Sequence, residues 1–303
     1  MYEKIVNADL NGDVRIVDLR SDTISKPTQE MREAMYNAVV GDDVYGEDPM
    51  VLELQRQAAE LVGKEDALFV ASGTMANLIS IMVHCSQRGS EIISGDNSHT
   101  FRFEQGGSAQ IAGVQTALLK NNEDGTFSLD ALRKKLGKIL IFMNLLPPLL
   151  SLKIRTICVV VRATRTRKAL GGGWRQAGIL AAAGLVALDK MIDRLQEDHD
   201  HAYKIAKAIA NLKSEIFKVD LKTVHTNIFM MYFDSSKFTA EDFLERIEEV
   251  RESDPIKVSV KAISCDSGCI RFVTYWEITV EDIDIAIKKI LSVIRELENK
   301  FNE

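Results

Sequence analysis

A short polar turn, Ser72–Gly73–Thr74, lies between two apolar segments and contains residues suited to binding an anion. Residues 67–70 before it predict a buried strand, and residues 75–85 after it predict a helix. The first N–H groups of a helix have no partner within the helix, and the helix dipole makes this end positive. The turn is therefore a candidate site for a phosphate or carboxylate, with a plain strand-to-helix turn as the alternative.

His99 follows another predicted strand, residues 91–94, in the string Asp-Asn-Ser-His. Open α/β sheets bind ligands at the ends of their strands, so the position favours a ligand contact. Glu104 and the pair Gly106–Gly107 come shortly afterwards. The flat imidazole could stack on an aromatic cofactor, and a surface histidine in a loop is the alternative.

Arg271 lies inside an apolar strand pattern, Cys-Ile-Arg-Phe-Val. A buried guanidinium needs an anionic partner and can grip a carboxylate or phosphate with two N–H groups. The alternative is an arginine that faces water from an edge strand.

Five basic residues surround the glycines 171–173, and a basic, glycine-rich bend can hold phosphate. They are Arg162, Arg165, Arg167, Lys168 and Arg175. A mobile surface loop is the competing interpretation. The string Asp198–His199–Asp200–His201 predicts a solvated helix face, because helical neighbours two apart point in different directions. We expect no metal site.

The elements that must position these residues predict an α/β fold. Helices are expected at residues 28–39, 50–62, 75–85, 129–136, 176–195, 196–212, 239–247 and 279–299, and strands at 16–19, 67–70, 91–94, 109–115, 226–232, 256–262 and 269–274. We expect a large domain over residues 1–206 with a mostly parallel sheet, and a small α+β domain over residues 207–303.

Composition excludes several classes of protein. The 303 residues carry a net charge of -6, which disfavours a nucleic-acid partner or an anionic membrane. No apolar run reaches the roughly 18 residues of a membrane helix. A polar, acidic first stretch argues against a signal peptide, and four scattered cysteines predict reduced thiols, so a cytoplasmic protein is expected.

Several motifs together resemble the low-specificity L-threonine aldolases, which are pyridoxal-phosphate (PLP) enzymes of the aspartate-aminotransferase fold, fold type I. The motifs are VDLRSDT (17–23), DDVYGEDP (42–49), ASGTMAN (71–77), Asp-x-Ser-His with the later Glu and Gly-Gly (96–107), RKALGGGWRQAG (167–178) and IRFVT (270–274). The resemblance covers roughly residues 14–136 and 162 to the end. It disfavours the reactions of a related aminotransferase or β-eliminating lyase as the activity of this chain.

The resemblance implies cleavage of L-threonine or L-allo-threonine to glycine and acetaldehyde with PLP, in a homotetramer. It also assigns roles to residues of this sequence. The implied roles are phosphate binding for Ser72, Gly73 and Thr74, stacking on the pyridine ring for His99, binding of the substrate carboxylate for Ser21 and Arg271, lining of the site for Tyr45 and Glu104, and phosphate binding in a neighbouring subunit for Arg175. One departure follows IRFVT, where the family's two histidines and acid are replaced by Tyr275, Trp276 and Glu277.

Two family segments do not occur in this sequence: S-K-G, which supplies the lysine that bonds to PLP, and D-G-A-R, which supplies the acid for the pyridine nitrogen. Both belong between residues 136 and 162, an interval too short for them. Reading residues 137–161 from the third base of each codon is compatible with a family-like string, x-E-P-T-T-S-L-I-x-x-E-N-T-H-N-M-C-G-G. Our hypothesis is a frame-shifted stretch followed by a deletion, and the alternative is a genuine divergent loop.

The hypothesis has consequences for fold and function. We expect an incomplete sheet with unpaired edges and an open core in the large domain. Without the lysine, both PLP binding and turnover are expected to be impaired. The alternative function is an inactive chain that only assembles with, or competes with, intact subunits.

Overall fold

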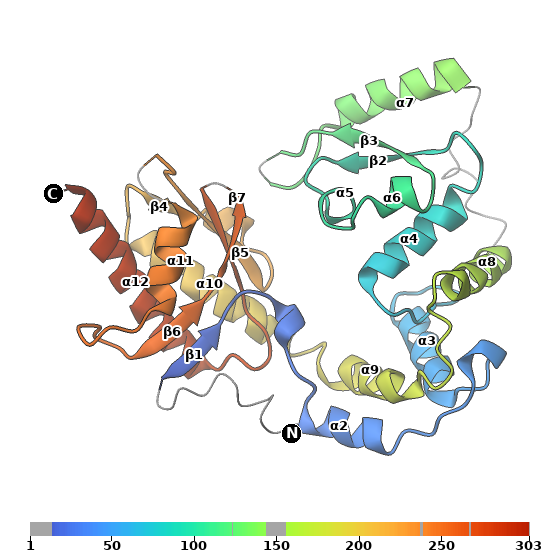
Figure 1. Cartoon of the computed structure of the whole chain (residues 1–303), viewed down its shortest axis with the longest axis horizontal. Coiled ribbons are helices and arrows are strands. Elements are labelled where there is room, and N and C mark those ends of the chain that lie inside the picture. The colour runs from blue at the N-terminus through green and yellow to red at the C-terminus, as the bar shows by residue number, and fades with distance from the viewer. Residues whose placement is uncertain (1–13, 123, 144–155, 237–238, 267, 303) are drawn as a thin grey trace. The chain divides into compact units, whose positions relative to one another are not determined.

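The computed structural model describes residues 14–122, 124–143, 156–236, 239–266 and 268–302. The chain folds into two compact units (Figure 1). We call Thr28–Asp189 the central unit, and Met1–Pro27 together with Lys190–Glu303 the terminal unit.

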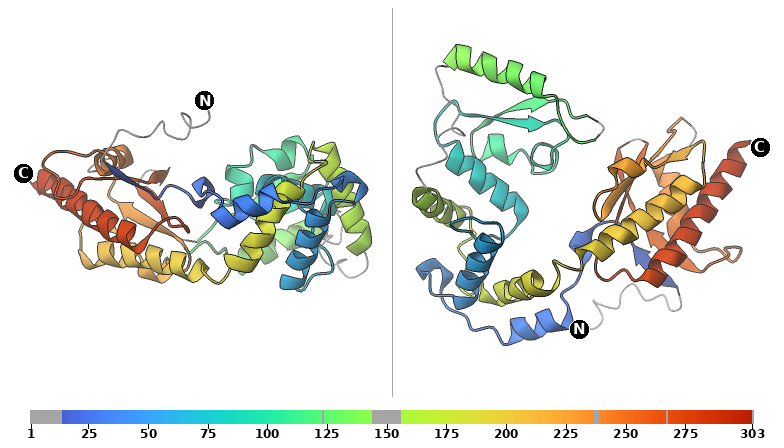
Figure 2. Two further views of the ribbon diagram at one scale, coloured as in Figure 1. Left: turned by 90° about the horizontal axis from the view of Figure 1, so that it is seen from below. Right: turned by 180° about the vertical axis from the view of Figure 1, so that it is seen from behind.

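Within its described residues, the terminal unit contains a parallel pair of strands and a four-stranded antiparallel sheet. The pair is β1 (Arg15–Asp18) with β6 (Val258–Lys261). The sheet has the order β4-β5-β8-β7, formed by Phe217–Lys218, Ile228–Phe233, Cys269–Val273 and Ile263–Asp266. The helices are α10 (Leu195–Asn211), α11 (Ala240–Glu248) and α12 (Val280–Asn302) (Figure 2). Two short 3₁₀ turns are η1 (Asp22–Ile24) and η4 (Leu221–Thr223).

The core of the terminal unit follows from the period of two in its strands. Phe229 and Met231 on β5 and Ile270 and Phe272 on β8 are at most 2% exposed. Residues between them, including Arg271, lie on the opposite face of the sheet because successive side chains alternate. Together with α10, α11 and α12, these strands bury a cluster of 27 hydrophobic residues.

The central unit is mostly helical and has one parallel pair of strands among its described residues. The pair is β2 (Glu91–Gly95) with β3 (Gln115–Leu119). The other elements are α2 (Gln29–Tyr36), η2 (Asp43–Tyr45), α3 (Pro49–Leu61), α4 (Gly73–His84), α5 (His99–Arg102), α6 (Gly107–Gln110), α7 (Leu129–Met143), α8 (Thr156–Ala169) and α9 (Gly178–Lys190).

The described part of the central unit buries little. Its hydrophobic cluster contains four buried residues, Val51, Leu54, Ala177 and Ala181, although the unit is longer than the terminal one. Large apolar side chains are exposed, among them Tyr36 at 90% and Val62 at 64%.

Two predicted strands of the central unit are wrong. Residues 67–70 are not a strand, because no strand lies beside them in the described structure; the Phe69 N–H donates to Gln55 Oε1 at 2.9 Å and the Phe69 carbonyl accepts from Arg167 Nη1 at 2.7 Å. Residues 109–115 form the end of α6 and a turn, and β3 begins only at Gln115. Gly113, with a left-handed φ of 66°, permits that turn.

The basic segment before the glycines is also different from the prediction. Residues 162–168 belong to α8 rather than to a bend or loop. The described stretch that follows the 137–161 interval is therefore ordered as a helix.

The compact units differ from the predicted domain division at residue 206 in two places. The parallel pairing of β1 with β6 joins residues 15–18 to the terminal unit. Helix α10 also belongs to that unit, because its apolar face packs in the 27-residue core.

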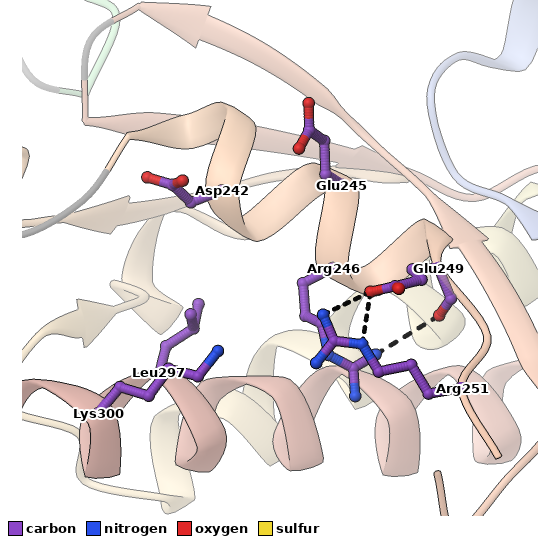
Figure 3. A pocket seen from close by; sticks show the side chains of 7 residues that line it. All are labelled: Asp242, Glu245, Arg246, Glu249, Arg251, Leu297 and Lys300. Carbon is purple, nitrogen blue, oxygen red and sulfur yellow. Dashed lines mark hydrogen bonds and ion pairs between the residues drawn. The ribbon is translucent and has the colours of Figure 1, made fainter. Parts of the chain in front are cut away.

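A polar cavity of about 480 Å³ lies between α11 and α12 (Figure 3). Its lining residues are Asp242, Glu245, Arg246, Glu249, Arg251, Leu297 and Lys300. Acidic and basic side chains pair with each other here, as Arg251 does with Glu249 at 2.7 Å. We assign the cavity no ligand. None of the described helices has the length and apolarity needed to span a membrane.

Candidate active site

The turn Ser72–Gly73–Thr74 begins α4 in the geometry of an anion site. Ser72 is the N-cap: its Oγ accepts the Met75 N–H at 3.1 Å and its carbonyl accepts the Ala76 N–H at 3.0 Å. Within the described structure, the N–H groups of Gly73 and Thr74 have no partner. Apart from the adjoining residues and the backbone of its own helix, no described atom lies within 4 Å of the position a Cβ would take at Gly73. The helix start therefore offers two free backbone donors with open space beside them.

His99 and Glu104 meet beside the same helix. His99 Nδ1 lies 3.0 Å from Glu104 Oε1, and Asn77 on α4 donates from Nδ2 to that oxygen at 2.7 Å. The Glu104 side chain is 5% exposed and that of His99 is 68% exposed. Since Asn77 is one turn beyond Gly73 on α4, the structure brings the helix start, Glu104 and His99 into one region.

Aspartates of the motif at residues 42–49 bind residues of the motif at residues 167–178. Asp43 forms a buried ion pair with Arg167 at 2.6 Å, and both side chains are about 5% exposed. Asp48 accepts the Gly178 N–H at 3.0 Å, and a Cβ at Gly178 would lie only 2.3 Å from Asp48 Oδ1. The two terminal nitrogens of Arg167 thus have partners within the protein, whereas its buried Nε has none among the described residues.

Tyr45 and Arg175 also lie together. Arg175 Nη1 donates to Asp42 Oδ2 at 2.5 Å, and its guanidinium lies 5.4 Å from the centre of the Tyr45 ring. The hydrogen bond to Asp42 and the contact with Tyr45 raise the pKa of Arg175. Tyr45 is 74% exposed and the Arg175 side chain is 46% exposed, so a ligand could reach both.

Ser21 and Arg271 lie in the terminal unit, where Arg271 on β8 contacts the backbone of the residue before Ser21. Arg271 Nη2 donates to the Arg20 carbonyl at 3.2 Å, and Ser21 Oγ accepts the Thr23 N–H at 3.3 Å. Arg271 Nε is buried without a hydrogen-bond partner among the described residues. Such a donor is costly to leave unpaired, and an anion such as a carboxylate would satisfy it.

The departure after IRFVT has a structural role. Trp276 Nε1 donates to the Lys26 carbonyl at 3.0 Å, and Glu277 Oε2 accepts the Lys26 N–H at 2.8 Å. These two residues fix the segment that follows η1. Burial, followed by the charge of Asp18, raises the pKa of Tyr275 to about 12.

The prediction of a solvated face at residues 198–201 is wrong for Asp198. Asp198 is 5% exposed, its carbonyl accepts the Thr274 hydroxyl at 2.6 Å, and Arg194 lies 3.4 Å from its carboxylate. Burial raises the pKa of Asp198. Among the residues that the structure covers, no group of three or more metal-binding side chains occurs.

Sequence reasoning missed Asn77 and the aspartates at 42, 43 and 48. A polar residue on an otherwise apolar helix was the available signal for Asn77. Each aspartate finds its partner more than a hundred residues away or at a backbone amide, and local patterns do not report such pairs.

Comparison with known proteins identifies the family to which the chain belongs. The family model described as Beta-eliminating lyase matches residues 18–154 and 150–236. Low-specificity L-threonine aldolase 1 of Arabidopsis thaliana is 35% identical over 346 aligned positions, which cover 89% of this chain and 94% of that protein. The corresponding protein of Escherichia coli strain K12 is 33% identical and the match covers 70% of this chain and 85% of that protein.

Solved structures share the fold. A structure from Listeria monocytogenes EGD-E described as an L-allo-threonine aldolase has a TM-score of 0.65 at 15% identity, covering 91% of this chain and 96% of that one. The predicted type I fold is thereby confirmed. With its family-model match and its relatives above 30% identity, the chain belongs to the β-eliminating lyase family, in the group of low-specificity L-threonine aldolases.

Proposed function

We propose that this chain is an L-threonine aldolase homologue that keeps sites for PLP and for an amino-acid carboxylate but, as translated, does not turn over threonine. One observation carries the proposal. The free helix start at Gly73 and Thr74 is present, whereas the S-K-G and D-G-A-R segments do not occur in the sequence.

The described residues fit part of the cofactor. The Gly73 and Thr74 amides and the positive end of α4 suit a phosphate, because they offer donors without any compensating acceptor. His99 carries an exposed, flat ring that is held at one nitrogen by Glu104, as a residue stacking on the pyridine ring would be. Arg271, with its unpaired Nε, suits the carboxylate of the substrate.

When bound, PLP supplies an electron sink for the charge left on Cα of threonine once the Cα–Cβ bond breaks and acetaldehyde departs. The resemblance assigns the lysine that anchors PLP and the acid that pairs with its ring nitrogen to the two segments that do not occur. In this proposal the described residues therefore bind and orient PLP and the substrate, and we assign to none of them the covalent bond with PLP.

The comparisons support a deletion at the 137–161 interval. The family model matches in two separate stretches, which overlap at residues 150–154. The alignment with the Arabidopsis relative has 346 positions, whereas 89% of 303 residues is about 270, so about 76 positions of that alignment are gaps in this chain. Sequencing the messenger across codons 136–162 tests the frame-shift hypothesis, which fails if the third-base frame does not spell the family-like string.

The activity test uses the full chain with PLP and either L-threonine or L-allo-threonine. Acetaldehyde is measured with a coupled alcohol dehydrogenase, and the E. coli aldolase serves as a positive control. We expect acetaldehyde at the level of the blank. Sustained acetaldehyde formation by the purified chain would overturn the proposal, and 2-oxobutanoate with ammonia would indicate β-elimination of threonine instead.

A second candidate is an inactive chain that assembles with, or competes with, intact subunits of a homotetramer in cytoplasmic threonine breakdown and glycine formation. The exposed apolar side chains of the central unit, such as Tyr36 and Val62, favour it. Co-expression with an intact relative tests it. A mixed oligomer with reduced activity per subunit supports this candidate, and separate elution of the two chains contradicts it.

A further inference from the structure

The Glu104 carboxylate is buried, and one of its oxygens lies within hydrogen-bond distance of two nitrogens. Asn77 Nδ2 lies 2.7 Å from Oε1 and His99 Nδ1 lies 3.0 Å from it. An ionised carboxylate only accepts hydrogen bonds, and a buried one is costly to leave without donors. The shorter contact, from Asn77, comes from a helix, whereas His99 belongs to the one-turn helix α5.

The acceptor character of Glu104 decides which nitrogen of His99 carries the proton. In a neutral imidazole one nitrogen donates and the other accepts. Because Nδ1 faces the carboxylate, Nδ1 carries the proton, and Nε2 keeps its lone pair. The His99 side chain is 68% exposed, so little besides this bond and the contact with Phe103, 5.5 Å between ring centres, restrains the ring.

We propose that Asn77 is a positioning residue: its amide fixes the Glu104 carboxylate, which in turn holds His99 as the Nδ1–H tautomer with Nε2 free. The inference deepens the proposed function, since it concerns the residue assigned to the cofactor ring. Asn77 does not itself contact a ligand in this scheme; it acts through Glu104.

Asn77 suits a test by substitution because it is an exposed residue of α4. Ser80 on the same helix is exposed too, and its hydroxyl donates only to the Ala76 carbonyl of its own helix at 2.8 Å, so Ser80→Ala is the matched control. Asn77→Ala removes the donor. Asn77→Asp keeps the shape but replaces the donor by an acceptor that repels Glu104.

The experiment is nitrogen NMR of the histidine side chains in the full chain without cofactor, with His99 assigned from a His99→Gln sample. In the unsubstituted chain we expect the Nδ1–H tautomer in about tenfold excess or more over the Nε2–H tautomer, since the free energy of a hydrogen bond to a charged group corresponds to at least that ratio. Glu104→Leu should abolish the excess. Asn77→Ala should lower it about threefold and Asn77→Asp at least as much, whereas Ser80→Ala leaves it unchanged.

Two results would overturn the proposal. One is an Nε2–H tautomer of His99 in the unsubstituted chain. The other is a tautomer ratio in Asn77→Ala and Asn77→Asp equal to that of Ser80→Ala, with circular dichroism showing all variants equally folded. Because the measurement needs no PLP and no turnover, it can fail while the proposed function holds, and it can succeed if that function is refuted.

Discussion

Asp254 is the acceptor of a buried charge cluster in the terminal unit, and replacing it gives a measurable loss of stability. Its carboxylate lies 2.5 Å from Arg246 and 2.6 Å from the Lys289 ammonium. The side chains are 3%, 8% and 1% exposed for Asp254, Arg246 and Lys289. Arg246 keeps Glu296 as a second partner, but Lys289 would keep only the Glu249 carbonyl.

Asp254→Asn therefore leaves a buried ammonium without a counter-charge. Breaking a buried ion pair by removing one partner costs about 3–5 kcal/mol. With a urea dependence of about 1–3 kcal/mol per molar, the unfolding midpoint should fall by at least about 1 M. Trp276 fluorescence reports the unfolding of this unit when Trp174, in the central unit, is replaced by Phe.

The matched control is Asp284→Asn, which removes an exposed ion pair with Lys204 whose side chains are 43% and 51% exposed. Exposed pairs contribute about 0–1 kcal/mol, so this midpoint should barely move. Equal effects of the two substitutions would refute the reasoning, because burial would then not determine the cost. Hydrogen bonds from Arg246 and Lys289 hold the pKa of Asp254 below its ordinary value, so its stabilisation is present above pH 3.8 and declines as the pH falls through the lower, folded-state pKa.

Three further predictions concern other sites. The pKa of Tyr275 is about 12 in the folded protein and about 10 in the unfolded chain, so the terminal unit should lose stability as the pH rises between these values. The Tyr275→Phe variant should lose less stability over this range, and an equal loss in the variant and the unsubstituted protein would contradict the prediction. Backbone amides of β8 and α12 should exchange with deuterium more slowly than those of β2 and β3, because the central unit buries a much smaller apolar cluster; mass spectrometry of peptides from the two units decides it. Gly178→Ala should destabilise the central unit by about 1–3 kcal/mol, because the new Cβ would meet the Asp48 carboxylate. Gly73→Ala should cost less, because Gly73 is exposed and has open space beside it. Urea unfolding followed by Trp174 fluorescence compares the two variants.

Local patterns in the sequence predicted helices that begin near residues 75, 239 and 279, and α4, α11 and α12 begin there. Ser72, Thr239 and Thr279 each cap one of these helices by accepting an N–H from its first turn. The apolar patterns at residues 226–232 and 269–274 predicted the strands β5 and β8, but they left open whether Arg271 is buried or faces water. These features depend on residues within a few positions of each other.

Features that depend on distant partners were not predictable. Residues 67–70 have strand-like composition, yet a strand exists only where a neighbour pairs with it, and here side chains of Gln55 and Arg167 take that place. The link from Asn77 through Glu104 to His99 likewise spans two helices and a loop. Within the candidate site, the sequence indicated the residues that could bind a ligand, but not the residues that position those ligand-binding side chains.

The central claim is that the chain has sites for binding PLP but has lost the lysine that should bond to it. The most direct measurement is reduction of the PLP-treated full chain with borohydride, followed by peptide mass spectrometry to find pyridoxyl-lysine. We predict no single lysine modified in stoichiometric amount and no visible absorption band removed by the reduction. One lysine labelled stoichiometrically, with loss of such a band, would contradict the account.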